Sequence, residues 1–242
     1  MTRQLPITDL ARATVLPLDE QYYALQQVKS GGGRGSYRPT RQNLPDIVNR
    51  HPGMFPAKRA PWRVVRDNVL KKCSSDTERR MNRRAAKAIY DYCQSENVSA
   101  RELDGYPLSL SIGLKLMCWS PALFVYDDRI SVPFFDMRRT YKLTRDANTF
   151  MFSVMHHALR VNNPDYRAVK FEILRLRDSK TRDVFPIMEG SRNLFSYEEI
   201  EAMVRVTHTL WLQIIEDRDA EARAAGQEWA SDTFFGKSLE QE

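Results

Sequence analysis

The sequence predicts an α+β domain in which several helices cover one face of a small, mainly antiparallel sheet made of two β-hairpins. In three segments, apolar residues recur every three or four positions, which is the spacing of an amphipathic helix. Two other segments, residues 124–138 and 169–188, each hold two short apolar runs separated by a polar turn, as hairpins do. The chain has 242 residues, of which 42% are hydrophobic, enough for one large domain or two small ones.

Residues 1–60 are expected to form a flexible basic arm in front of this domain. Residues 30–36 read Ser-Gly-Gly-Gly-Arg-Gly-Ser, a composition typical of a flexible linker and without the lysine of a phosphate-binding P-loop. Within the arm, residues 18–28 are predicted to form one short helix. Four prolines after the linker are spaced too closely for a long helix: Pro39, Pro45, Pro52 and Pro56.

The predicted globular domain spans residues 61–225 and opens with two helices. Pro61 suits the first turn of a helix, and apolar residues follow it at helical spacing. Ser75 and Glu78 have the spacing of a capping box, in which each side chain bonds to the backbone of the other residue. This pattern predicts a second helix over residues 76–95.

The middle of the domain is expected to mix helices and strands. Residues 99–102 have the pattern of another capping box, and residues 108–119 are predicted to form a buried helix. The first hairpin follows over residues 124–138, where Pro133 indicates an edge strand or a bulge. The other predicted elements are a helix over residues 148–159 and the strands of the second hairpin, residues 169–176 and 184–188.

A long helix closes the predicted domain. It begins at a third capping box, formed by Ser196 and Glu199, and Gly226 follows its end. Residues 226–242 are expected to form an acidic tail with three aromatic residues that could dock on the body of the protein: Trp229, Phe234 and Phe235.

Charge is distributed unevenly along the chain. The net charge is +6. Residues 29–87 hold sixteen Lys and Arg and four Asp and Glu, whereas residues 188–242 hold five Lys and Arg and twelve Asp and Glu. Five cations share one face of the predicted helix over residues 76–95, and three more arginines belong to the arm. The candidate binding residues are therefore Arg79, Arg80, Arg83, Arg84, Lys87, Arg34, Arg38 and Arg41.

The leading hypothesis from this charge is a non-catalytic protein that binds DNA or RNA with low sequence specificity. Like charges four residues apart on a helix repel each other, and phosphates would relieve this repulsion. The alternative is a protein–protein adaptor, whose basic face meets an acidic protein or the acidic region of a second copy. In that case the arm could fold on binding a protein partner.

The sequence raises two more specific hypotheses of function. A winged helix would read DNA with residues 108–119, but that segment holds one cation and no Arg, Asn or Gln to read base edges. A metal-dependent nuclease would use Asp136, Glu172 and Glu189 to hold Mg²⁺. Against it, the alternating pattern of residues 169–176 places Glu172 on a solvent-facing side of its strand.

No metal, cofactor or membrane is predicted. Cys73, Cys93 and Cys118 are too scattered for a disulfide framework or a zinc site, and the last two are expected in the core. Residues 1–20 lack the apolar run of a signal peptide. The most apolar stretch, residues 108–126, is interrupted by polar residues, whereas a membrane-spanning helix needs roughly 20 apolar residues. The chain is therefore expected to be soluble and cytoplasmic.

Overall fold

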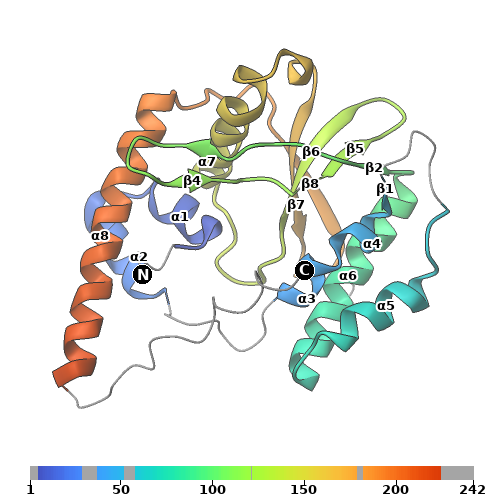
Figure 1. Cartoon of the computed structure of the whole chain (residues 1–242), viewed down its shortest axis with the longest axis horizontal. Coiled ribbons are helices and arrows are strands. Elements are labelled where there is room, and N and C mark those ends of the chain that lie inside the picture. Colours follow the sequence, from blue (N-terminus) through green and yellow to red (C-terminus); the bar gives the residue numbers. More distant parts are fainter. Residues whose placement is uncertain (1–4, 29–36, 52–57, 121, 179–181, 225–242) are drawn as a thin grey trace, which may run out of the picture.

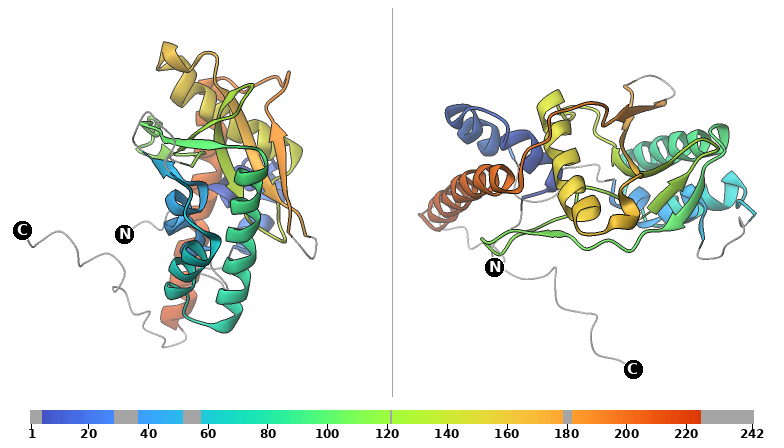
Figure 2. Two further views of the ribbon diagram at one scale, coloured as in Figure 1. Left: turned by 90° about the vertical axis from the view of Figure 1, so that its right-hand side faces the viewer. Right: turned by 90° about the horizontal axis from the view of Figure 1, so that it is seen from above.

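A six-stranded mixed sheet lies at the centre of the structure, and helices cover both of its faces (Figure 1, Figure 2). The structure is a computed structural model that describes residues 5–28, 37–51, 58–120, 122–178 and 182–224. In spatial order the strands are β1 (Arg50–His51), β2 (Ser99–Glu102), β5 (Ala122–Val125), β6 (Ile130–Asp136), β7 (Lys170–Leu176) and β8 (Val184–Met188).

The predicted α+β class is confirmed, but the predicted sheet is too small and has the wrong pairing. The two hairpins exist, since β5 pairs with β6 and β7 with β8 in antiparallel fashion. They join into one sheet because β6 and β7 run parallel, with Ser131 opposite Lys170 and Asp136 opposite Arg175. A parallel pair needs a crossover, which is supplied here by α7 (Arg145–Met155) and a π-helix (His156–Val161).

β6 is a central strand and not the edge strand that Pro133 indicated. The ladder between β5 and β6 covers only the first residues of β6, where Phe124 lies opposite Ser131 and Val125 opposite Ile130. Pro133 lies beyond this ladder, and its carbonyl accepts a hydrogen bond from the backbone of Ser120 at 2.8 Å. The missing N–H of Pro133 costs no hydrogen bond, because the ladder between β5 and β6 does not extend to this residue.

Each face of the sheet has its own core. Phe171 and Ile173 of β7 pack among α1, α2, α7 and α8, whereas Leu174 and Leu176 pack among α4, α5 and α6. This alternation along one strand shows that both faces are buried, so the expectation that helices cover one face is wrong. The helices are α1 (Ile7–Ala13), α2 (Leu18–Gln26), α3 (Arg38–Gln42), α4 (Leu44–Val48), α5 (Trp62–Lys71), α6 (Asp76–Ser95) and α8 (Tyr197–Ala224).

The predicted helix over residues 108–119 is wrong. This segment forms a small separate hairpin of β3 (Leu108–Ser109) and β4 (Lys115–Leu116). Leu108, Leu110 and Leu116 are buried while Ser109, Ser111 and Lys115 are exposed, a period of two. Gly113 turns the chain with a φ of +79°. Residues 99–102 likewise form β2 instead of starting a helix, so the winged-helix arrangement is absent.

The segment expected to be a flexible arm contributes to both cores. Leu10 of α1 and Leu25 of α2 are buried in the first core, and Ile47 of α4 in the second. The predicted short helix over residues 18–28 is confirmed as α2. Prolines start these helices instead of breaking them: Pro6 and Pro17 immediately precede α1 and α2, and Pro39 and Pro45 lie in the first turns of α3 and α4.

One of the three capping boxes is confirmed in full, at the start of α8, where Ser196 N–H donates to Glu199 Oε2 at 2.7 Å. At the start of α6 only half of the predicted box forms, because the Glu78 carboxylate accepts a hydrogen bond from Ser74 N–H instead of Ser75 N–H. The Glu78 backbone N–H donates to Ser75 Oγ at 3.2 Å at the start of α6, and Glu199 N–H donates to Ser196 Oγ at 3.1 Å at the start of α8. The linker over residues 30–36 and the tail over residues 226–242 lie outside the described residues. None of the helices in the described part of the chain is long and apolar enough to cross a membrane.

We predict that the buried amide of Asn82 fastens α3 to α6. Asn82 Oδ1 accepts hydrogen bonds from Thr40 N at 3.1 Å and from Thr40 Oγ1 at 2.7 Å, and Thr40 is fully buried. Asn82→Ala leaves these donors unsatisfied and should lower the free energy of unfolding by about 1–3 kcal/mol. Urea denaturation measures this change.

The control is Gln94→Ala, which removes an exposed amide from the same helix. It should change stability by less than about 0.5 kcal/mol. Equal effects of the two substitutions would show that the bonds between Thr40 and Asn82 do not hold α3 in place.

Candidate partner-binding surface

Helix α6 displays a row of cations on its outer face. It has 20 residues, and its inner face is lined with small and apolar side chains, Ala85, Ala86 and Ile89 among them, all with 0% exposure. This face packs on the sheet through the second core, which fixes the rotation of the helix about its axis. The outer face then presents the five predicted cations, all exposed: Arg79, Arg80, Arg83, Arg84 and Lys87.

Few acids neutralise this row. Arg79 lies 3.8 Å from Asp76, and Lys87 lies 2.6 Å from Asp91 and also 5.7 Å from the centre of the Trp62 ring. Among the described residues, no ion pair forms at Arg80, Arg83 or Arg84. Positive charge is therefore concentrated in the first half of the helix.

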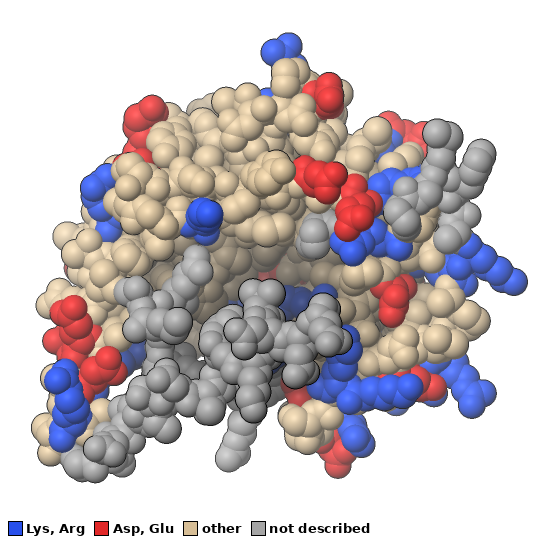
Figure 3. Space-filling view, in the orientation of Figure 1, with Lys and Arg blue, Asp and Glu red and all other residues tan. Residues whose placement is uncertain are grey.

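The short helix α3 extends the basic surface. It is held against α6 by the bonds between Thr40 and Asn82, and both Arg38 and Arg41 are exposed on it. Arg34 lies outside the described residues. Figure 3 shows Lys and Arg side chains gathered over the region of α3, α5 and α6. We call the exposed cations of α6 and α3 the basic face.

The three carboxylates of the nuclease hypothesis do not come together. Asp136 ends β6 and lies 3.4 Å from the Arg175 guanidinium, whereas Glu172 lies opposite Pro133, three residues earlier in the ladder and on the other face of the sheet. Glu189 forms an ion pair with Arg160 at 2.6 Å. Across the described residues, no group of three His, Cys, Asp or Glu side chains could hold a metal ion.

Glu172 is fully buried, contrary to the prediction of a solvent-facing position. The pattern misled because helices cover both faces of β7. Its Oε1 accepts hydrogen bonds from Tyr126 Oη at 2.7 Å and from Ser131 Oγ, and Oε2 has no hydrogen-bond partner among the described residues. Burial raises the pKa of Glu172, although these two bonds and the Arg129 charge oppose the shift.

The hydroxyl of Tyr126 links this carboxylate to the end of α6. It lies 3.1 Å from Tyr92 Oη, and burial raises the pKa of Tyr92 to about 12. The Arg129 guanidinium stacks 3.7 Å from the centre of the Tyr126 ring. These contacts tie the C-terminal end of α6 to the sheet.

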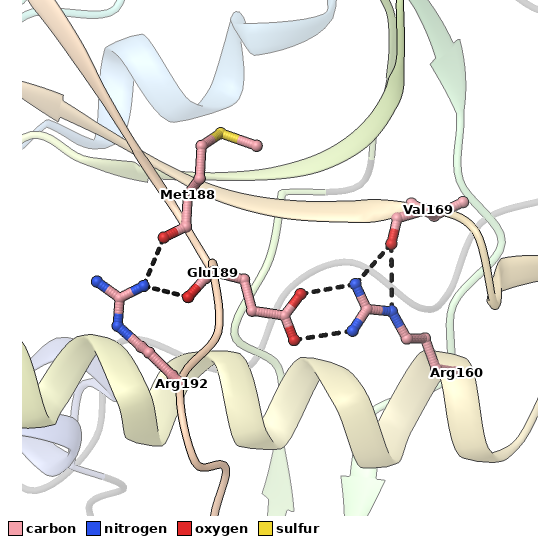
Figure 4. Close-up of polar contacts among 5 residues, drawn as sticks. All are labelled: Arg160, Val169, Met188, Glu189 and Arg192. Atoms are coloured by element: carbon pink, nitrogen blue, oxygen red, sulfur yellow. Dashed lines mark hydrogen bonds and ion pairs between the residues drawn. The ribbon is translucent and has the colours of Figure 1, made fainter.

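The buried ion pair between Arg160 and Glu189 fastens the crossover between β6 and β7 to the hairpin of β7 and β8 (Figure 4). Arg160 of the π-helix donates to both carboxylate oxygens of Glu189 and to the carbonyl of Val169, and it lies 4.0 Å from the centre of the Phe171 ring. Arg192 donates to the carbonyls of Met188 and Glu189. Both side chains of this pair are more than four-fifths buried, so it holds the hairpin in place and offers no open carboxylate.

The cysteines behave as core residues, as predicted for two of them. Cys93 and Cys118 have 0% exposure, and Cys73 is buried as well. Burial raises the pKa of Cys93 to about 12 and raises that of Cys118 still further. Neither thiol forms a thiolate near neutral pH, so neither is a nucleophile at that pH.

Comparisons with known proteins decide between the two kinds of partner. The model of the family described as sliding clamp-binding bacterial toxin SocB matches residues 8–221. The chain belongs to this family. It is also 31% identical over 226 residues to the DNA replication inhibitor toxin SocB of Caulobacter vibrioides (strain NA1000 / CB15N), an alignment that covers 92% of this chain and 94% of the relative. No solved structure matches the chain.

Membership of this family contradicts the nucleic-acid hypothesis. The family is described by its binding to a sliding clamp, which is a protein, so the alternative of a protein–protein interaction agrees better. The charge misled because cations attract an acidic protein surface and a phosphate backbone alike. Sequence reasoning named Glu172 but missed its burial and its hydroxyl partners, because Tyr126 and Ser131 are far from Glu172 in sequence and meet it only in the fold.

We predict that Glu172 makes the protein less stable as pH rises. Its pKa is higher in the folded than in the unfolded chain, so the folded state binds the proton more tightly. The resulting stability is present below the unfolded carboxyl pKa and is lost as pH rises through the folded pKa. Glu172→Gln keeps an oxygen acceptor and removes the titration. Its stability relative to the wild type should therefore increase with pH, as measured by thermal unfolding between pH 4.5 and 8.5.

Glu221→Gln is the matched control, because Glu221 is exposed on α8. Its stability difference from the wild type should stay nearly constant over the same pH series. A Glu172→Gln difference that is flat with pH would show that the buried carboxyl is not the titrating group.

Proposed function

We propose that this chain is a toxin that inhibits DNA replication by binding the sliding clamp. The observation that carries the proposal is the family match over residues 8–221, which takes in nearly all of the described helices and strands. The relative from Caulobacter vibrioides, which is named a DNA replication inhibitor toxin, aligns over almost its whole length. An inhibitor of this kind works by occupying its partner in the bacterial cytoplasm and requires no catalytic group.

We further propose that the basic face contributes to the contact with the clamp. Arg80, Arg83 and Arg84 are exposed on a helix that is firmly packed from below, so their positions are set before the partner arrives. An acidic surface on the partner would relieve the repulsion between these neighbours. Complementary charge of this kind raises the rate of association and suppresses wrong partners.

The first test of the proposed function is direct binding to the purified sliding clamp of the bacterium that encodes the chain. We expect a complex in size-exclusion chromatography and a dissociation constant in the micromolar range or tighter by biolayer interferometry. The chain should also slow a clamp-dependent primer-extension reaction, and added clamp should restore the rate. If no complex forms and extension is unaffected, the proposed function is wrong.

The basic face is tested by reversing three of its charges. Arg80→Glu, Arg83→Glu and Arg84→Glu combined should weaken clamp binding roughly tenfold or more, because attraction is replaced by repulsion. The weakening should be largest at low salt, since added salt screens these charges. Biolayer interferometry over a salt series measures both effects.

The matched control reverses three other exposed cations, Arg145, Arg167 and Lys170. Both triple variants make the same change in net charge, so a loss confined to the α6 variant assigns the contact to the basic face. Equal affinities of the two variants would refute this assignment while leaving clamp binding intact. Light scattering of the chain alone shows whether the basic face instead joins two copies.

A further inference from the structure

An apolar groove opens on the opposite side of the sheet from the basic face. It lies where α1, the β3–β4 hairpin and α8 meet (Figure 1), and its volume is about 450 Å³. Its walls include Leu5, Ile7 and Leu10 from the region of α1, Leu114 and Met117 from the hairpin, and His208 from α8. A volume of this size lies in the range of roughly 300–1,000 Å³ that is usual for ligand sites.

Exposed apolar side chains belong to the groove or adjoin it in sequence. Met117 is 39% exposed, and Tyr106, which immediately precedes the lining residue Pro107, is 86% exposed. Lys115 and His208 are the only polar side chains among the lining residues. A concave apolar surface of this kind is typical of a site where another apolar group docks.

The chain itself supplies a group of this kind beyond the described residues. Residues 225–242 follow α8 and contain four acids, one lysine and three aromatic residues. Phe234 and Phe235 are adjacent and follow Asp232 by two and three positions. An adjacent aromatic pair complements an apolar groove of this kind.

Simple geometry selects these two phenylalanines. From Ala224, where α8 ends, back to His208 is 16 residues of helix, or about 24 Å. Ten residues connect Ala224 to Phe234, and they span up to roughly 33–36 Å when extended. The five residues to Trp229 span only about 17 Å. Phe234 and Phe235 therefore reach the level of the groove, and Trp229 does not.

We propose that the C-terminal segment of this chain folds back along α8 and inserts Phe234 and Phe235 into the apolar groove between α1, the β3–β4 hairpin and α8. The covalent link makes this an intramolecular event with a high effective concentration, so a small contact suffices to close it. The proposal does not rest on clamp binding, because it concerns a different face and a contact within one chain.

The test is photo-cross-linking in the full-length chain with p-benzoylphenylalanine in place of Phe234. We expect cross-links within one chain to residues 5–10 and 114–117, mapped by mass spectrometry. The same photoreactive residue in place of Trp229 should give no cross-links to these segments. Cross-links from position 234 only to other regions, or only between two copies, would overturn the proposal, as would none at all.

A pair of surface variants confirms that the groove is the acceptor. Met117→Asp in the chain with the photoreactive residue at position 234 should reduce cross-linking to residues 5–10 at least fivefold. Val64→Asp is the control, because Val64 is an exposed apolar side chain on α5 and does not line the groove. Circular dichroism establishes that both variants are folded. Equal cross-linking in the two variants would show that the phenylalanines dock elsewhere.

Discussion

The parallel pairing of β6 with β7 is the constraint on which the rest of the structure depends. It joins two antiparallel hairpins into one sheet, and it forces the chain through a crossover on one face. The other face of this wider sheet also carries apolar side chains, and α4, α5 and α6 bury them. The outer surface of α6 is therefore available to a partner because its inner surface is required by the sheet.

Elements with a local signal could be predicted from the sequence. Ser75 and Ser196 mark the starts of α6 and α8, because a capping box depends on residues three positions apart. Both hairpins could be predicted for the same reason, since their turns are local. The amphipathic pattern also placed all five cations of α6 on its exposed face.

Features that depend on distant contacts could not be predicted. Glu172 alternates with apolar neighbours as a solvent-facing residue would, and only the cover supplied by α6 makes it buried. The prolines near the N-terminus suggested a broken chain, although Pro39 and Pro45 begin helices once the short turns pack on α6. In residues 108–119 the alternating leucines were mistaken for a buried helix, because a short apolar run has no clear period.

The basic face shows what a charge pattern in the sequence can and cannot predict. The positions of Arg80, Arg83 and Arg84 were predicted correctly, but the chemistry of the partner was not, since Coulomb attraction does not distinguish phosphates from carboxylates. Non-specific binding of nucleic acid needs only phosphate contacts, which these arginines could make, so it is the family match that contradicts this partner and not the shape of the surface. A rigid row of cations suits an acidic protein surface equally well, and there charge sets the rate and the orientation of docking.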